Sequence, residues 1–358
     1  MYTFPGNNTA QGFFSYYHDL TAAASRVFLL KGGPGTGKST LMRRVAQHFQ
    51  DAGQMVDLHL CSGDPHSLDA VSIPALGTLI ADATSPHPIE PSAPGLREDI
   101  IALGDYWNRT QLLRDQSAIL ALDTQRRAAY RTAYALLREA MAARSAVDEA
   151  LQPAIAQLRS EVQRCYNEMC ALLKTAPPEA HPTHRHCFYT AITYCGQISI
   201  APTLDGTTAL VAVNNPSWSE LVANIEYTCR LQGISTLLLA DPLHPIQWEG
   251  IYLPSLNRLY IKQPAEGTTT GGLYEEAMLR TLRTQPLWAD LSLPAPDTVT
   301  EVWQLREIQR IQDAQTHLTK AHDLHTQIES HYSPAMDFSG VADCCYSIIE
   351  EIESLPLK

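Results

Sequence analysis

The sequence lacks the features that would place the chain in a membrane, outside the cell or along a nucleic acid. Its 358 residues contain no apolar run of about 18 residues, the length that a membrane-spanning helix needs. The first residues show no basic segment followed by an apolar one, so we expect no signal peptide. A formal net charge of −12 makes nucleic acid an unlikely partner. These absences predict a globular cytoplasmic protein without a membrane span.

Cysteine is present, but not in the spacing of metal or redox motifs. The eight cysteines form no C-x-x-C pair, and in a chain of this length we expect reduced thiols. The length is sufficient for about two domains with a sizeable core.

One strong motif stands in the first half, where residues 32–40 read GGPGTGKST. The stretch fits G-x-x-x-x-G-K-[ST], the Walker A phosphate-binding loop, with Gly32, Gly37, Lys38 and Ser39 in the fixed positions. The apolar run at 26–30 predicts a buried strand before the loop, and apolar residues at helical spacing follow it. Strand, glycine-rich loop and helix are the arrangement that this motif requires.

The residue types of the loop predict how it binds a nucleotide. Glycines let the backbone curl so that its amides point at phosphate oxygens, and the helix that follows adds the positive end of its dipole. Lys38 would bridge the β- and γ-phosphates, and the Ser39 hydroxyl would ligate Mg²⁺. The expected cofactors are therefore ATP and Mg²⁺. The residues expected around them are Gly33, Pro34, Gly35, Thr36, Gly37, Lys38, Ser39 and Thr40.

A short apolar stretch at 78–82 ends in Asp82, which is the form of a Walker B strand. There the aspartate would help to fix the metal ion, so Asp82 is the second predicted metal residue. No glutamate follows Asp82, and the Asp-Glu pair that places the catalytic base in many ATPases is therefore missing. Another carboxylate has to orient the attacking water, or hydrolysis is slow.

The candidates for that carboxylate are Asp64 and Asp69, with Glu90 as a further choice. Asp64 follows a predicted strand at 55–61, and ligands of open α/β sheets lie at the carboxyl ends of strands. Turn formation is the alternative reading of Asp64, because Asp favours loops. The proline-rich stretch at 85–95 predicts a long loop, in which His87 is expected to be structural.

Two further segments are predicted to be helical. A helix capped by Thr9 would carry aromatic side chains, one of which could stack on adenine. Long amphipathic patterns on both sides of Pro153 predict an antiparallel helical hairpin at 109–178. Such hairpins offer a surface for a protein partner.

The second half reads as a worn copy of the first, shifted by 180 residues. Ser39 then meets Ser219, and Pro65 meets Pro245, but Lys38 faces Trp218 and Asp82 faces Lys262. We therefore expect an α/β fold in which a P-loop NTPase core, a parallel sheet with flanking helices, is duplicated in tandem, each copy followed by a helical hairpin. The predicted division is nucleotide-binding core, hairpin, degenerate core and second helical region, at 1–108, 109–178, 179–295 and 296–358.

With these residues in view, the chain resembles a family of tandem P-loop ATPases, without an assigned substrate, from Gram-positive and often spore-forming bacteria. The resemblance is strongest over residues 4–108. It rests on the stretches LKGGPGTGKST (30–40), CSGDP (61–65), IPALG (73–77), DATSPH (82–87) and LGDYW (103–107). It implies ATP binding and hydrolysis. Family members often keep both loops intact, whereas this chain departs from the pattern at the second loop.

Three functions remain open at this point. The first is Mg-dependent ATP hydrolysis at the first core, with the second core a non-binding partner that could lend an arginine such as Arg258, Arg280 or Arg283. The second is a small-molecule kinase that uses the same loop, with the Asp64 turn holding an acceptor hydroxyl. The third is a nucleotide-gated binding module with negligible turnover.

Overall fold

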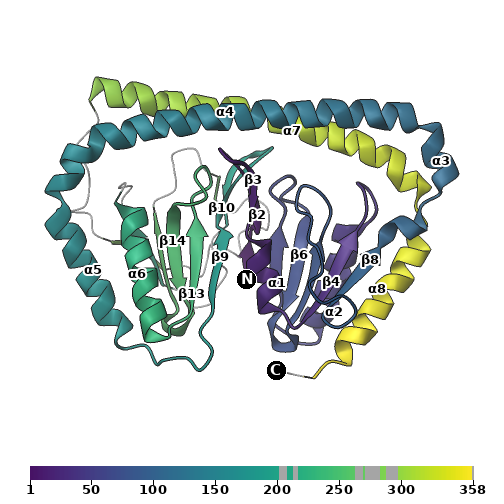
Figure 1. The fold of residues 1–358 in the computed structure, drawn as a ribbon, viewed down its shortest axis with the longest axis horizontal. Coiled ribbons are helices and arrows are strands. Elements are labelled where there is room, and N and C mark those ends of the chain that lie inside the picture. Colours follow the sequence, from purple (N-terminus) through teal and green to yellow (C-terminus); the bar gives the residue numbers. More distant parts are fainter. Residues whose placement is uncertain (201–207, 213–216, 263–268, 271–282, 288–296, 357–358) are drawn as a thin grey trace.

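The computed structural model describes residues 1–200, 208–212, 217–262, 269–270, 283–287 and 297–356. Two β-sheets lie side by side beneath a pair of long helices that spans both of them (Figure 1). Each sheet carries helices on its outer side. Within the described part of the chain, every helix is too short or too polar to cross a bilayer.

The first sheet has six strands in the order β1-β5-β6-β7-β4-β8. Their bounds are β1 (Tyr2–Thr3), β4 (Arg26–Lys31), β5 (Asp57–Leu60), β6 (Leu68–Ile73), β7 (Thr78–Asp82) and β8 (Glu98–Ala102). β6 runs antiparallel to both of its neighbours, and the other three pairings are parallel. The expectation of a parallel sheet is thus only partly right. A single 3₁₀ turn, η1 (Pro74–Leu76), joins β6 to β7, which is too short for the crossover that a parallel pair needs.

The core of the first half explains why the predicted strand and helix around the loop form. The four central residues of β4 are completely or almost completely buried. Helix α2 (Lys38–Asp51) buries one face against the sheet, through Leu41, Met42, Val45, Ala46 and Phe49. The apolar spacing of this segment therefore predicted the right element and the right buried face.

The predicted helix from Thr9 is wrong. Strands β2 (Gly6–Thr9) and β3 (Gly12–Ser15) form a hairpin there, and helix α1 begins only at Tyr17 and ends at Ala23. Asn8 donates from Nδ2 to the Ile192 carbonyl at 2.9 Å, and the Ile192 amide donates to Asn7 Oδ1 at 3.0 Å. These buried bonds to the second half hold the segment extended, which local sequence spacing cannot reveal.

The second sheet has the order β17-β12-β15-β14-β13-β9, with the same pairing directions as the first. Its strands are β9 (His184–Phe188), β12 (Thr208–Ala212), β13 (Thr236–Ala240), β14 (Trp248–Leu253), β15 (Arg258–Lys262) and β17 (Arg283–Leu287). Leu58 pairs with Val71 in the first sheet, and Leu238 pairs with Ile251 in the second. Helix α6 (Trp218–Gln232) follows β12 as α2 follows β4. A small sheet is formed by β10 (Thr190–Thr193), β11 (Gly196–Ser199) and β16 (Thr269–Thr270).

The long helices do not form the predicted hairpins. Helices α3 (Arg109–Arg114), α4 (Gln116–Gln157) and α5 (Arg159–Leu173) follow the first sheet, and Pro153 lies inside α4. α4 runs antiparallel to α7 (Thr298–Tyr332) instead of folding back on α5 (Figure 1). Their shared seam is a buried cluster that includes Ala133, Leu137, Ala140, Ile311, Ala314 and Leu318. Spacings of three and four predict a helical seam but do not name the partner helix.

The end of the chain returns to the first half. After α7 come the 3₁₀ turn η5 (Ser333–Ala335) and helix α8 (Phe338–Glu353). α8 packs on α2, and Val341, Cys345 and Ile349 belong to the core cluster of the first half. In the same way α5 packs on α6 of the second half. This return brings residues from the end of the chain to the glycine-rich loop.

Candidate functional site

The glycine-rich loop lies between the end of β4 and the start of α2, as its motif predicts. Gly35 and Gly37 have φ angles of 68° and 85°, in the left-handed region where a side chain is strained. Thr36 is buried, and its Oγ1 donates to the Gly33 carbonyl at 2.9 Å. The loop is therefore a defined turn that only glycine fits at two positions.

The structure brings Lys38 and Asp82 together. Lys38 Nζ lies 3.5 Å from Asp82 Oδ2, and it donates to the carbonyls of Gly32 at 2.7 Å and Gly33 at 2.9 Å. Asp82 reaches this position because β7 is the parallel neighbour of β4, with Leu30 paired to Asp82. Both side chains are nearly buried, at 13% and 14% exposure.

Ser39 and Asp69 lie on the adjoining side of the site. Ser39 Oγ accepts a hydrogen bond from the Leu68 amide at 3.0 Å, which fixes the start of β6 against α2. The next residue, Asp69, is buried, and its Oδ2 has no hydrogen-bond partner among the described residues. Burial raises the pKa of Asp69 and the charge of Asp82 raises it further, while His87 acts in the opposite direction.

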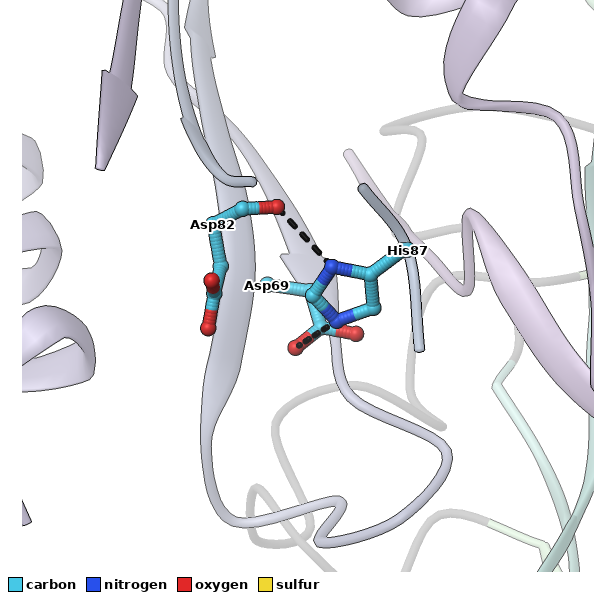
Figure 2. A group of neighbouring side chains, drawn as sticks. All are labelled: Asp69, Asp82 and His87. Carbon is cyan, nitrogen blue, oxygen red and sulfur yellow. Dashed lines mark hydrogen bonds and ion pairs between the residues drawn. The ribbon is translucent and has the colours of Figure 1, made fainter. Parts of the chain in front are cut away.

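Asp69, Asp82 and His87 form a compact group at this edge of the sheet (Figure 2). One ligand atom of each lies within 4.8 Å of the others, so the group could hold a metal ion. His87 Nδ1 is 2.9 Å from the Asp82 carbonyl oxygen. Because a carbonyl only accepts, that nitrogen carries the proton. His87 Nε2 then faces Asp69 Oδ1 at 3.7 Å. From the sequence we expected only a structural position for His87, although its place five residues after Asp82 is a signal for this grouping.

Asp64 lies in the turn after β5 and is committed to that turn. Its Oδ1 accepts from the His66 amide at 3.1 Å, and its Oδ2 accepts from Ser67 Oγ at 2.6 Å. The geometry favours the turn reading, and a catalytic role for Asp64 stays a prediction. Glu90, the further choice, is 80% exposed and pairs with Lys31 at 3.3 Å.

The corner between α7 and α8 covers the loop, which the sequence did not predict. The Gly35 amide donates to Glu329 Oε1 at 3.2 Å, and Ser333 Oγ donates to the Gly35 carbonyl at 3.4 Å. A Cβ added at Gly33 would lie 3.4 Å from the Tyr332 ring. The hydrogen bond with His325 lowers the pKa of Glu329, and the Gly35 amide and Lys38 lower it further. The Glu329 carboxylate thus accepts a hydrogen bond from a loop amide that, in the Walker A motif, would donate to a phosphate oxygen.

A cavity of about 220 Å³ adjoins the same loop, between α2 and α8. Its lining combines the end of the loop with residues of both helices, namely Gly37, Thr40, Leu41, Arg44, Phe338, Val341 and Cys345. The predicted adenine-stacking aromatics at 13–17 are not among them.

The corresponding edge of the second sheet repeats some contacts and replaces others. Ser219 Oγ accepts from the Trp248 amide at 2.9 Å, as Ser39 does from Leu68. Trp218 stands where the first half has Lys38; it is buried, and its Nε1 donates to the Glu249 carbonyl at 2.8 Å. A buried indole therefore stands at the sequence position that matches Lys38.

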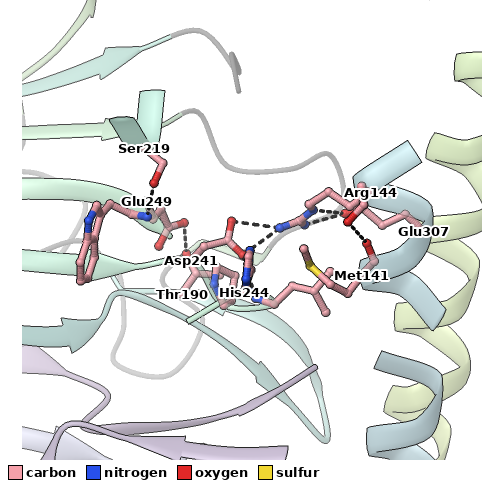
Figure 3. A network of polar contacts seen from close by, with 12 residues as sticks. Met141, Arg144, Thr190, Ser219, Asp241, His244, Glu249 and Glu307 are labelled. Atoms are coloured by element: carbon pink, nitrogen blue, oxygen red, sulfur yellow. Dashed lines mark hydrogen bonds and ion pairs between the residues drawn. The ribbon is translucent and has the colours of Figure 1, made fainter. Parts of the chain in front are cut away.

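Acidic groups at this second edge are paired with a cation from α4 (Figure 3). Arg144 Nη1 lies 2.8 Å from Asp241 Oδ1, and Arg144 Nε lies 2.9 Å from Glu307 Oε1 of α7. Burial raises the pKa of Asp241, but Arg144, Lys262 and the backbone amides of His244 and Leu243 together lower it by more, so that the net pKa is lowered. Glu249 accepts from Thr190 Oγ1 at 2.6 Å, and burial raises its pKa to about 8.

Part of the comparison between the two loops lies outside the described residues. This applies to residues 213–216, which align with loop positions, and to Arg280. It applies also to the side chain of Arg283. Arg258 begins β15, at the opposite end of that strand from Lys262.

Comparison with known proteins gives one match. A family model described as the N-terminal region of nephrocystin 3 matches residues 13–96. The matched segment contains the glycine-rich loop, Asp69 and Asp82, and none of the second half. Comparisons with curated proteins and with solved structures found no match. The resemblance to bacterial tandem ATPases stays a prediction.

Proposed function

We propose that the chain is a P-loop NTPase that binds Mg-ATP at the first half and hydrolyses it. The observation that carries this proposal is the placement of Lys38 beside Asp82, at a loop whose Gly35 and Gly37 adopt left-handed conformations. Loop amides, a lysine and the aspartate of the neighbouring strand are the parts that phosphate binding and metal binding require. The family-model match over residues 13–96 covers all of them.

The residues present fit Mg²⁺. Ser39 Oγ and the Asp82 carboxylate are hard oxygen donors on adjoining elements, and the unpartnered Oδ2 of buried Asp69 lies nearby. Ser39 and Asp82 would hold the ion, which when bound neutralises charge on the phosphates.

The side chains then divide the work of hydrolysis. Lys38 and the loop amides orient the phosphates and stabilise the charge that develops on them. Asp69 is the carboxylate placed to orient water, because Asp64 is committed to its turn. The water oxygen bonds to the γ-phosphorus, the bond to the β-phosphate oxygen breaks, and the water proton passes to the products.

We propose further that the second half is a duplicated copy that does not bind nucleotide. The same strand order and the same serine contact support the duplication. Trp218 in the place of Lys38, and Arg144 bound to Asp241, support the loss of binding.

A nucleotide-gated binding module is a second candidate, favoured by the bond from Gly35 to Glu329. This contact joins the loop directly to α7. A nucleotide phosphate that takes over the Gly35 amide would break this hydrogen bond and release Glu329, which changes how α7 is held against the loop. Among the residues that the structure describes, no contact favours the kinase alternative, since Asp64 is already engaged in its turn.

The test compares the purified full-length protein with Lys38→Ala and Asp82→Ala, by calorimetric ATP binding and by phosphate release with and without Mg²⁺. Turnover that both substitutions abolish, with the fold retained by circular dichroism, supports the ATPase. Tight binding without turnover supports the gated module. Phosphate release that persists in Lys38→Ala contradicts the proposed site.

A further inference from the structure

The lining of the cavity between α2 and α8 does not include Lys38, Asp82 or Asp69. Gly37 and Thr40 contribute to it from the loop and the first turn of α2, and Phe338 contributes from the start of α8. Its volume is about 220 Å³, which is smaller than the roughly 300–1,000 Å³ of pockets for drug-sized ligands. The space therefore suits one flat ring system.

The position of the cavity along the loop indicates what that ring system is. A nucleoside triphosphate held with its β- and γ-phosphates at Lys38 extends past the first turn of α2, where Thr40 lies. Thr40 and Arg44 are four residues apart on α2 and share one face of the helix. Both line the cavity. The cavity therefore lies beside the end of the loop from which the ribose and base of such a ligand would extend.

The walls of the cavity have the chemistry of a base-stacking site. The Phe338 side chain is 48% exposed, and its ring lies against the loop, with Cε1 3.4 Å from the place of a Cβ on Gly37. An exposed aromatic ring beside a backbone without a side chain offers a flat apolar face, on which bases stack. The Arg44 guanidinium is planar and stacks on aromatic faces as well. The remaining lining is mainly apolar, from Leu41, Val341 and Cys345.

We propose that this cavity is the base-binding subsite of the nucleotide site, in which a purine ring lies between Phe338 and Arg44. This assignment rests on the proposed function of the loop and extends it by naming the base class and the residues that hold the base. The largely apolar lining selects by ring size and stacking and reads few hydrogen-bonding groups. The subsite therefore favours purine over pyrimidine nucleotides and discriminates weakly between ATP and GTP.

The subsite also assigns a function to helix α8. α8 belongs to the core of the first half although it follows the second half in sequence. Its first residue supplies the aromatic wall, so a complete nucleotide site needs residues from both ends of the chain.

The experiment separates the base from the phosphates by using two probes, Mg-ATP and magnesium tripolyphosphate. Calorimetry is done on the full-length wild type, Phe338→Ala, Phe338→Leu and the control Tyr346→Ala. Tyr346 lies on α8, is 66% exposed and does not line the cavity. We expect Phe338→Ala to weaken ATP binding by roughly 5- to 150-fold, the range for loss of one base-aromatic stack. Phe338→Leu, which keeps an apolar side chain, falls between it and the wild type. Tripolyphosphate affinity stays at the wild-type value in all variants, and CTP binds the wild type more weakly than ATP does.

The outcomes that overturn the subsite differ from those that overturn the loop. Equal ATP affinity in the wild type and both Phe338 variants, or a parallel loss of tripolyphosphate binding, contradicts a base-stacking role but leaves the loop proposal intact. A wild type that binds neither probe contradicts the proposed function itself, and the subsite with it.

Discussion

The two halves present the same sheet edge with different contents. In the first half the cation at the edge belongs to the loop itself, because Lys38 lies beside Asp82. In the second half the corresponding sequence position holds buried Trp218, and a cation, Arg144, comes from the long helix α4, while Lys262 at the end of β15 adds a second positive charge near the acid that Arg144 binds. The strand order and pairing directions are the same in both.

This difference teaches that strand order alone does not make a nucleotide site. Because this edge has no lysine at the loop position, its buried acids need other partners, since a buried unpaired charge is costly. Arg144 supplies that partner for Asp241, and Glu249 keeps a proton instead, with its pKa raised to about 8. The second edge is thereby closed by internal contacts.

The helices that reach the two edges bring opposite charges. α4 brings Arg144 to an acid of the second edge, whereas α7 brings Glu329 to an amide of the first. A carboxylate on a loop amide can be exchanged for a phosphate, but an arginine buried between two acids cannot leave without large cost. We therefore propose the first edge, and not the second, as the one that exchanges an internal contact for a ligand.

The largest expected effect comes from breaking the closed edge. Arg144→Ala leaves Asp241 and Glu307 without their partner, and we expect it to lower the free energy of unfolding by about 3–5 kcal/mol. Arg127→Ala on the same helix removes an arginine that is 69% exposed, and it should cost at most about 1 kcal/mol. Urea denaturation measures both. Similar losses in the two variants would contradict the buried network.

The next effect is on ATP affinity, which we expect to depend on the edge of the first sheet. Lys38→Ala removes a charged donor to phosphate, worth about 1.5–3 kcal/mol, so we expect ATP affinity to fall by about 10- to 150-fold in calorimetry. Trp218→Phe, the change at the matching position of the second half, should leave ATP affinity unchanged. If Trp218→Phe weakens ATP binding as Lys38→Ala does, the two edges are not distinct in function.

A smaller effect follows from the carboxylate that α7 places on the loop. Glu329→Ala frees the Gly35 amide and removes a negative charge that competes with phosphate. One such hydrogen bond is worth about 1 kcal/mol, so ATP affinity should rise about fivefold. Glu301→Ala, on the exposed first turn of the same helix, is the control. Weaker ATP binding in Glu329→Ala would mean that the carboxylate assists the nucleotide.

A further effect is a pH dependence of the stability that arises at the second edge. The pKa of Glu249 is raised from 4.5 to about 8 by burial, with Asp241 raising it and Lys262 and Thr190 opposing. Between these values the folded protein keeps a proton that the unfolded chain has released, so this group lowers stability as pH rises from about 4.5 to about 8. Glu249→Gln cannot ionise and should show a flatter dependence in urea denaturation at pH 5 and pH 8. An unchanged dependence would exclude a protonated Glu249.

The parts of the site that follow from local spacing could be predicted from the sequence. The loop residues, Lys38 and Asp82 are such cases, because a strand end and a helix start fix their positions. The position of His87 near Asp82 could also have been predicted, because His87 follows Asp82 by only five residues. Asp69 was placed at the right edge, but its burial beside His87 depends on how β6 and β7 pair.

The contacts that depend on the path of the whole chain could not be predicted. Glu329 and Phe338 reach the loop because α7 and α8 return to the first half, about 300 residues after it. The segment at 6–15 is a hairpin because buried asparagines bond to the second half. The seam of α4 has a helical spacing that would suit several partners, and only the fold selects α7.

The most direct test of the account is the stoichiometry of Mg-ATP binding to the full-length chain, measured by isothermal titration calorimetry beside Lys38→Ala. We predict one ATP per chain in the wild type and an affinity about 10- to 150-fold lower in Lys38→Ala. Two ATP molecules per chain, or a single site that Lys38→Ala leaves intact, would contradict the distinction between an open first edge and a closed second one.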